Sequence, residues 1–124
     1  MVGTEANPFD ALAPFYDSWY STPLGAVVGR HERDLLLCLA RPGRGERALE
    51  VGIGTGYFAQ ALIEAGVHVA GVDLSLPMLR QAAGKGLPVV RGDAQALPIR
   101  REQFDLVLTV TMLEFGRASC RERV

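Results

Sequence analysis

The segment ALEVGIGTGYFAQAL, Ala48–Leu62, decides how this chain is expected to fold. Its first four residues, apolar apart from one glutamate, predict a buried strand, and its last residues have the spacing of a helix. Glycine stands at every second position of the turn between them, at Gly52, Gly54 and Gly56. Glycine this dense is costly in conformational entropy, so the turn must have a use for it. That use is a phosphate cradle, a nucleoside cradle or a tight turn alone.

Strand and helix patterns continue on both sides of this segment. The expected elements, in chain order, are one or two short helical pieces within 9–25, a helix over 25–40, a strand at 48–51, a helix within 57–66, a strand at 67–72, a helix from 76 to about 84, a strand at 88–92 and a strand at 104–110. Ser75 is placed to cap the helix that begins at Leu76 and Pro77. The alternation predicts an α/β fold with a mostly parallel sheet and crossover helices.

The apolar positions also predict which side chains turn inward. One face of the helix over 25–40 is defined by residues at four-residue steps, namely Val27, His31, Leu35 and Leu39. His31 is expected to be half-buried, and Cys38 is expected in the core, as free cysteines usually are. In the helix within 57–66, Phe58, Leu62 and Ile63 are expected to point inward.

Composition excludes several classes of protein. The 124 residues are enough for one domain, and 48% of them are hydrophobic. A net charge of −1 lacks the basic footprint of a nucleic-acid binder, and no run approaches the ~18 apolar residues of a membrane span. The N-terminus has no signal-peptide pattern. Cys38 and Cys120 form neither a disulfide framework nor a metal-ligand spacing, so no metal and a reducing cytoplasm are expected.

The last nine residues, GRASCRERV at 116–124, differ sharply in composition from the apolar run before them. They back-translate into a DNA string that resembles a common sequencing adapter read in frame. We interpret 116–124 as a sequencing-adapter scar and leave it out of fold reasoning, the alternative being a natural arginine-rich tail. Without these residues the chain has 10 basic and 13 acidic residues.

The ligand class of the glycine turn depends on its flanking residues. A dinucleotide fingerprint has the form G-x-G-x-x-G, and counting from Gly52 its last glycine falls on Tyr57. Glu50 precedes the turn. A carboxylate sits poorly beside a pyrophosphate and suits a cationic amine or sulfonium. A nicotinamide dinucleotide, another nucleoside ligand and a turn without a ligand all stay open.

Polar residues that could bind a nucleoside also follow the second and third predicted strands. Asp73 follows the second strand, where a carboxylate can accept hydrogen bonds from ribose hydroxyls, the alternative being an aspartate at a helix N-terminus. Asp93 follows the third strand and could accept from an adenine amino group, while the N–H group of Ala94 could reach a ring nitrogen. The alternative for Asp93 is an ordinary turn residue.

Four stretches in this order, LEVGIGTG, GVDLSLPML, GDAQALPI and FDLVLTVTMLEF, resemble the motifs of class I S-adenosylmethionine-dependent methyltransferases, in particular the methyltransferase type 11 group. The earlier stretch APFYDSWYSTPLG resembles that group's N-terminal cap. The resemblance implies a Rossmann-like, doubly wound sheet that is incomplete, with about four of about seven strands. It also implies a helical cap over 1–40 and a partial cofactor-binding domain over 41–115.

Position by position, the resemblance implies roles for nine residues. These are Glu50 and the backbone of Gly52, Gly54 and Gly56 for the methionine portion, Asp73 for the ribose, Leu74, Asp93 and Ala94 for the adenine, and Thr109 beside the sulfonium. The residues from Thr109 to Met112 read TVTM, not the Asn/Asp-Pro-Pro-aromatic motif of enzymes that methylate exocyclic amines. C- or O-methylation is therefore favoured.

Methyl transfer from a sulfonium needs positioning of the acceptor more than a fixed catalytic group. No residue is therefore firmly assigned as catalytic, and Tyr20 and Glu114 are the candidates. The residues that could contact the acceptor are Tyr16, Trp19, Tyr20, His31 and Glu114. We expect a methyltransferase that acts on a small molecule, without nucleic acid and with its oligomeric state open. The alternatives are an NAD(P)-dependent oxidoreductase and a non-catalytic nucleoside-binding module. The 124-residue chain by itself is expected to bind cofactor weakly or not at all and to show no turnover.

Overall fold

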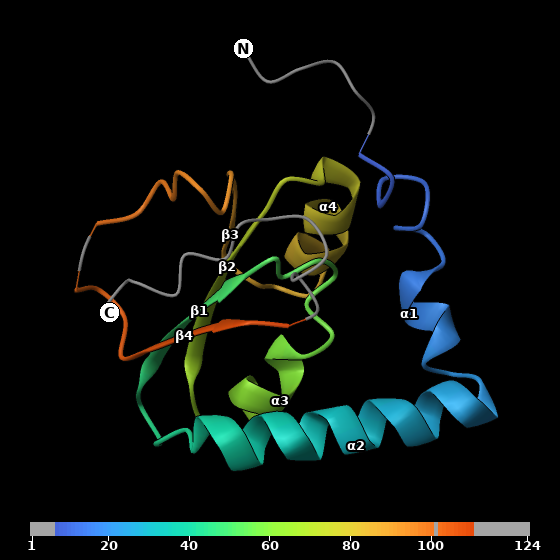
Figure 1. The fold of residues 1–124 in the computed structure, drawn as a ribbon, viewed down its shortest axis with the longest axis horizontal. Coiled ribbons are helices and arrows are strands. Elements are labelled where there is room, and N and C mark those ends of the chain that lie inside the picture. Colours follow the sequence, from blue (N-terminus) through green and yellow to red (C-terminus); the bar gives the residue numbers. More distant parts are fainter. Residues whose placement is uncertain (1–6, 101, 111–124) are drawn as a thin grey trace.

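The computed structural model describes residues 7–100 and 102–110 and contains one parallel sheet (Figure 1). Its strands, in spatial order, are β3 (Val89–Arg91), β2 (His68–Asp73), β1 (Arg47–Val51) and β4 (Leu106–Thr109). Each neighbouring pair is parallel, and Val51 lies opposite both Val72 and Thr109. The α/β fold class predicted from the alternating pattern is thus confirmed. Because the strands are parallel, their carboxyl ends meet at one edge of the sheet.

Four helices accompany the sheet in the described ranges, namely α1 (Tyr16–Trp19), α2 (Pro23–Ala40), α3 (Ala59–Glu64) and α4 (Leu76–Gly84). The crossovers from β1 to β2 and from β2 to β3 contain α3 and α4. As predicted, the Ser75 hydroxyl accepts a hydrogen bond from the Met78 N–H group at 3.3 Å. The helix α2 begins at Pro23, earlier than the apolar pattern indicates, because Thr22 caps it and proline suits a first helical position.

Two apolar clusters cover the two faces of the sheet. One contains Ala48 and Leu62 and lies under α3 and α4, and the other contains Leu49, Val51 and Val72. Alternate residues of a strand point to opposite faces, so these two clusters account for the buried residues of β1 except one polar side chain. That exception is Glu50, which shares the face of Ala48 and is buried.

The expected orientation of α2 is wrong. The face predicted from Val27, His31, Leu35 and Leu39 is exposed, with Leu39 at 75% of its full accessibility. The buried residues of α2 are Gly25 and Gly29. A Cβ atom at Gly29 would lie 2.3 Å from the Tyr57 hydroxyl, so only a glycine lets α2 approach this ring. Close contact with the aromatic rings thus decides the packing face.

Two further burial expectations are also wrong. Cys38 and Ile63 were expected to point inward, and both are exposed. Cys38 lies on the same side of α2 as the exposed Leu35, and Ile63 is near the end of the short helix α3. The adjacent Leu62 is fully buried, as predicted.

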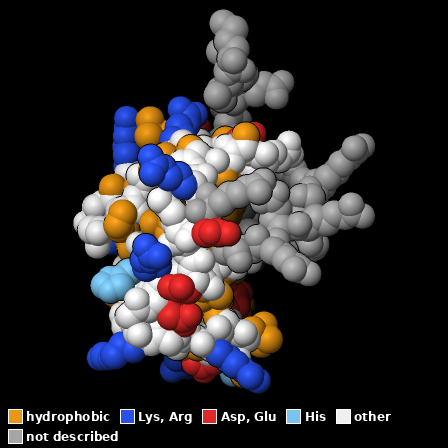
Figure 2. Space-filling view, turned by 90° about the vertical axis from the view of Figure 1, so that its left-hand side faces the viewer, with side chains coloured by type: hydrophobic (Ala, Val, Ile, Leu, Met, Phe, Trp, Pro, Cys, Tyr) orange, Lys and Arg blue, Asp and Glu red, His pale blue; other side chains and the backbone are white. Residues whose placement is uncertain are grey.

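Charged side chains of both signs are interspersed on the side of the molecule opposite α1 (Figure 2). None of the helices in the described ranges has the length and hydropathy of a membrane span. Within those ranges no three metal-ligating side chains come together.

Candidate functional site

The glycine turn has a backbone that other residues avoid. Gly52, Gly54 and Gly56 have φ angles of 78°, 57° and 82°. A Cβ atom at Gly56 would lie 2.2 Å from Cδ1 of Leu87, whereas one at Gly54 would meet no heavy atom within 4 Å. Gly56 is therefore required by packing inside the protein. Gly54 leaves its backbone open to approach from outside, as a ligand cradle would need.

Asp73 joins the glycine turn to the next loop. It is the last residue of β2, its Oδ2 atom accepts a hydrogen bond from the Gly54 N–H group at 2.8 Å, and its Oδ1 atom accepts one from the Ser75 N–H group at 2.9 Å. Each carboxylate oxygen keeps a further acceptor position. Asp73 is thus fixed by backbone donors and can still accept hydroxyl groups from a ligand.

Glu50 is a carboxyl group without a protein partner for one of its oxygens. Its side chain is 1% exposed, and Oε2 has no hydrogen-bond partner among the described residues. Burial, and then the negative charge of Asp73, raise the pKa of Glu50 from 4.5 to about 8. A buried polar atom left unsatisfied is costly and is a typical sign of a binding function.

The segment that follows β3 lies beside the carboxyl end of β2, next to Asp73. The Gly92 N–H group donates to the Asp73 carbonyl at 3.0 Å, so the segment after β3 runs beside the end of β2. Asp93 accepts from the Gln95 N–H group at 2.9 Å, and both Asp93 and Ala94 are exposed. The turn expected as the alternative for Asp93 is therefore present, and the hydrogen bond from Gln95 uses one of the two carboxylate oxygens.

The remaining residues predicted for the site are Leu74, Thr109 and Glu114, and the structure describes the positions of the first two. Leu74 directly follows Asp73 and is exposed, as a residue that packs on a ligand would be. Thr109 ends β4 opposite Val51, so the strand register alone brings it to the edge. Glu114 lies outside the described residues.

Tyr20 stacks on the residue that follows the glycine turn. Its ring and that of Tyr57 have centroids 3.6 Å apart and planes 10° apart. Burial, and next a hydrogen bond with Tyr16, raise the pKa of Tyr20 above its usual range. Tyr20 therefore keeps its proton near neutral pH, and its hydroxyl can act as a hydrogen-bond donor but not as a base.

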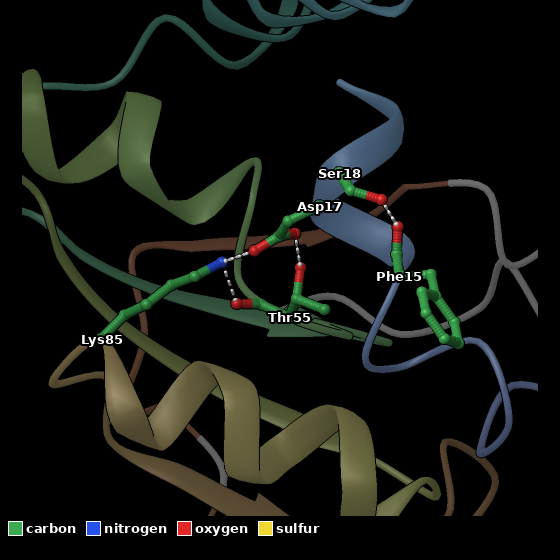
Figure 3. Close-up of polar contacts among 5 residues, drawn as sticks. All are labelled: Phe15, Asp17, Ser18, Thr55 and Lys85. Carbon is green, nitrogen blue, oxygen red and sulfur yellow. Dashed lines mark hydrogen bonds and ion pairs between the residues drawn. The ribbon is translucent and has the colours of Figure 1, made fainter. Parts of the chain in front are cut away.

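Sequence reasoning missed a polar network above the glycine turn (Figure 3). Asp17 in α1 accepts hydrogen bonds from the Thr55 hydroxyl at 2.6 Å and from the Lys85 ammonium group at 2.5 Å. Asp10 likewise accepts from the Ser75 hydroxyl at 2.6 Å. No local pattern connects residues so far apart in the chain, so their spacing contains no signal of these contacts.

The methyltransferase domain model matches residues 49–120 of this chain. That range begins inside β1 and includes the glycine turn, Asp73 and Asp93. The matched range ends at residue 120, so it also includes the first five residues of the segment 116–124.

Two curated relatives resemble most of the chain. A malonyl-[acyl-carrier protein] O-methyltransferase of Pseudescherichia vulneris is 37% identical over 82% of this chain and 39% of its own length. A demethylmenaquinone methyltransferase of Roseiflexus castenholzii is 38% identical over 82% of this chain and 44% of its own length. The chain thus spans less than half the length of these relatives.

A solved structure extends the likeness to the fold. A S-adenosylmethionine-dependent methyltransferase of Thermotoga maritima, described as a possible histamine N-methyltransferase, has a TM-score of 0.64 and 30% identity over 85% of this chain and 46% of its own. Its cofactor is the one that the motifs of this chain imply. The matched domain model, the two curated relatives and this solved structure together show that the chain belongs to the methyltransferase domain family, in the type 11 group of S-adenosylmethionine-dependent enzymes.

Proposed function

We propose that this chain is the N-terminal, cofactor-binding portion of a methyltransferase that transfers a methyl group from S-adenosylmethionine to a small molecule. The observation that carries the proposal is Glu50, a buried carboxyl with an unpartnered oxygen beside a glycine turn. Such a group fits a ligand that brings a positive charge or hydrogen-bond donors. The bound cofactor would supply a methyl group on a positively charged sulfur.

The proposed roles of the chain's own residues follow from their placement. Glu50 and the open backbone at Gly54 receive the cationic methionine portion, and the free acceptor positions of Asp73 receive the ribose hydroxyls. Exposed residues at or just after the carboxyl ends of β2, β3 and β4 complete the site, with Leu74 and Asp93–Ala94 toward the adenine and Thr109 toward the sulfur. These residues bind and orient, which an already activated methyl donor needs most.

Glu50 argues against the oxidoreductase alternative, whereas Asp73 suits the ribose of either ligand. A nicotinamide dinucleotide would place its pyrophosphate at the glycine turn, next to Glu50. The two negative charges of the pyrophosphate would oppose ionisation of this buried carboxyl and would bring its unpartnered oxygen no hydrogen-bond donor. A sulfonium nucleoside has a positive charge and avoids this cost.

An apolar, uncharged small molecule is the acceptor that the N-terminal residues support best. A pocket of about 210 Å³ is lined by Leu12, Phe15, Tyr16, Trp19 and Tyr20. The names of the two curated relatives describe an O-methylation and the methylation of a quinone precursor, in line with the C- or O-methylation favoured by TVTM. We place this reaction in the cytoplasm.

Saturation-transfer NMR tests the proposal, because it detects the weak binding expected of this chain. S-adenosylhomocysteine should receive saturation from the wild-type protein and lose it in Asp73→Ala, while NADH should receive none. Asp34→Ala is the matched control, since Asp34 is exposed on α2, away from the site. Saturation of NADH together with none on S-adenosylhomocysteine would overturn the proposal.

We also propose that 1–40 acts as a cap, that 41–115 belongs to the cofactor-binding domain and that 116–124 is a sequencing-adapter scar. Sequencing the native locus across the codon for Phe115 tests the last point. A reading frame that continues with further strand-like segments supports the scar. A locus that encodes GRASCRERV and a stop codon contradicts it.

A further inference from the structure

Lys85 follows α4 directly, and its side chain reaches the backbone of the glycine turn. The ammonium group donates one hydrogen bond to the Thr55 carbonyl at 2.8 Å and another to the Asp17 carboxylate, which also accepts from the Thr55 hydroxyl (Figure 3). Thr55 is 1% exposed, so its carbonyl and its hydroxyl both need protein partners. Lys85 and Asp17 supply these partners from two other parts of the chain.

The glycine turn needs such a contact, because glycine gives it little stiffness of its own. Thr55 stands between Gly54 and Gly56, whose φ angles are 57° and 82°. Glycine adopts positive and negative φ values with similar ease, so the peptide groups beside these residues can rotate at little steric cost. The Thr55–Gly56 peptide group is held at both ends, with its N–H group on the Ile53 carbonyl at 3.0 Å and its carbonyl on Lys85. Removing Lys85 would take the donor from that carbonyl.

The segment that carries Lys85 is itself fixed against the glycine turn. Lys85 is the C-cap of α4, and its N–H group donates to the Ala82 carbonyl at 3.0 Å. Leu87, two residues later, is buried and lies so close to Gly56 that a Cβ atom there would be 2.2 Å from its Cδ1 atom. This segment therefore meets the turn through one apolar contact and one charge-assisted hydrogen bond, and the latter kind is stronger than a neutral hydrogen bond.

We propose that Lys85 is a positioning residue for the proposed cofactor site, which keeps the glycine turn in one conformation, and that Asp17 orients the Lys85 ammonium group. Gly54 is the open position of the turn, and Asp73 accepts from its N–H group at 2.8 Å. Asp73 and Lys85 thus fix the backbone before and after Gly54. A site that is formed in every molecule binds more tightly than one that is formed in a fraction of them. The role in ligand binding rests on the proposed function, whereas the contact with the turn does not.

Backbone NMR tests the effect of Lys85 on the turn without any ligand. The Gly56 amide nitrogen belongs to the peptide group that Lys85 contacts, so its chemical shift reports on this hydrogen bond. The Lys85 side chain is 29% exposed. In Lys85→Met the Gly56 signal should move and its amide exchange should speed up about fivefold, as expected for one partly exposed charge-assisted hydrogen bond. Arg80→Met, on the exposed side of α4, is the matched control and should change neither.

Two further variants separate the charge of Lys85 from the role of Asp17. Lys85→Arg should restore part of both Gly56 readouts, because arginine keeps a charged donor in a different geometry. Asp17→Asn removes the ion pair but keeps an oxygen that can accept from the Thr55 hydroxyl. By itself it should move the Gly56 signal in the same direction as Lys85→Met, and in the Lys85→Met background it should add little. Full addition of the two effects would overturn the orienting role of Asp17.

Ligand affinity tests the consequence for binding, with S-adenosylhomocysteine as the probe and saturation-transfer NMR as the readout. Lys85→Met should raise Kd about fivefold, while its urea denaturation midpoint stays close to that of Arg80→Met. A midpoint that falls together with the affinity would make Lys85 a stability residue and overturn the positioning role.

The remaining outcomes distinguish this proposal from the proposed function. An unchanged Gly56 signal in Lys85→Met would overturn the proposal, and a changed signal with an unchanged Kd would overturn the part that concerns binding. A Gly56 signal that responds, with no S-adenosylhomocysteine bound to any form, would support the contact of Lys85 with the turn and count against the proposed function.

Discussion

Replacing Glu50 by glutamine should change how the stability of this protein depends on pH. Glutamine has nearly the same shape but cannot ionise. The wild-type side chain is 1% exposed, and burial followed by the charge of Asp73 raise its pKa from 4.5 to about 8. Between these two values the folded protein keeps a proton on Glu50 that the unfolded chain has released.

The sign and size of the effect follow from this difference in bound protons. Because the folded state holds more protons, the free energy of unfolding falls as pH rises. The contribution of Glu50 is complete below about pH 4.5 and is lost as pH passes through about 8. The whole difference corresponds to about 5 kcal/mol, which is comparable with the total stability of a small domain.

Urea denaturation followed by circular dichroism at several values between pH 5 and pH 8.5 measures this dependence. We expect a steep fall for the wild type, a much flatter profile for Glu50→Gln and a crossing that leaves the variant more stable at pH 8. Glu64→Gln is the control, since Glu64 is exposed and pairs with Arg33 at the surface. Parallel profiles for wild type and Glu50→Gln would refute the reasoning, because they would mean that Glu50 is ionised throughout.

Three further substitutions test the packing around the site by the same denaturation assay. Gly56→Ala should lower the free energy of unfolding by about 3 kcal/mol, since it combines a positive φ with a clash against Leu87, and an unchanged midpoint would contradict the observed turn. Ser75→Ala should cost about 1 kcal/mol through the lost cap of α4, with Ser75→Thr expected to recover most of it. Leu62→Ala should cost about 2–5 kcal/mol because Leu62 is fully buried, whereas Ile63→Ala, its exposed neighbour, should cost much less.

The fold was predictable where local chemistry and tertiary structure agree. The glycine turn, the Ser75 cap and the strand ends at Asp73 and Thr109 each depend on short stretches of sequence. Parallel pairing then requires those strand ends to share one edge, so most of the candidate site follows from topology.

The parts that were not predictable depend on contacts across long stretches of chain. Apolar periodicity located α2 correctly, but its packing face is set by the fit of Gly29 against Tyr57. The bonds from Asp17 to Thr55 and Lys85 join three separate elements, and no spacing rule covers them. Tyr20 was expected to be a candidate for acceptor contact, and its stack on Tyr57 joins two residues too far apart in the chain for a spacing rule to predict.

Glu50 and Asp73 are two acidic residues of the site whose carboxyl groups differ in hydrogen bonding. Asp73 receives two backbone N–H groups and is satisfied in the folded protein, while Glu50 has a buried oxygen with no described partner. The cost of Glu50 to the protein alone is the free energy that a cationic ligand would recover by supplying that partner. A ligand that binds there would favour the ionised carboxylate and lower its pKa. Saturating S-adenosylhomocysteine should therefore flatten the fall in stability toward pH 8 in the wild type and leave Glu50→Gln unaffected in slope. Equal stabilisation of both proteins at every pH would separate Glu50 from the ligand altogether.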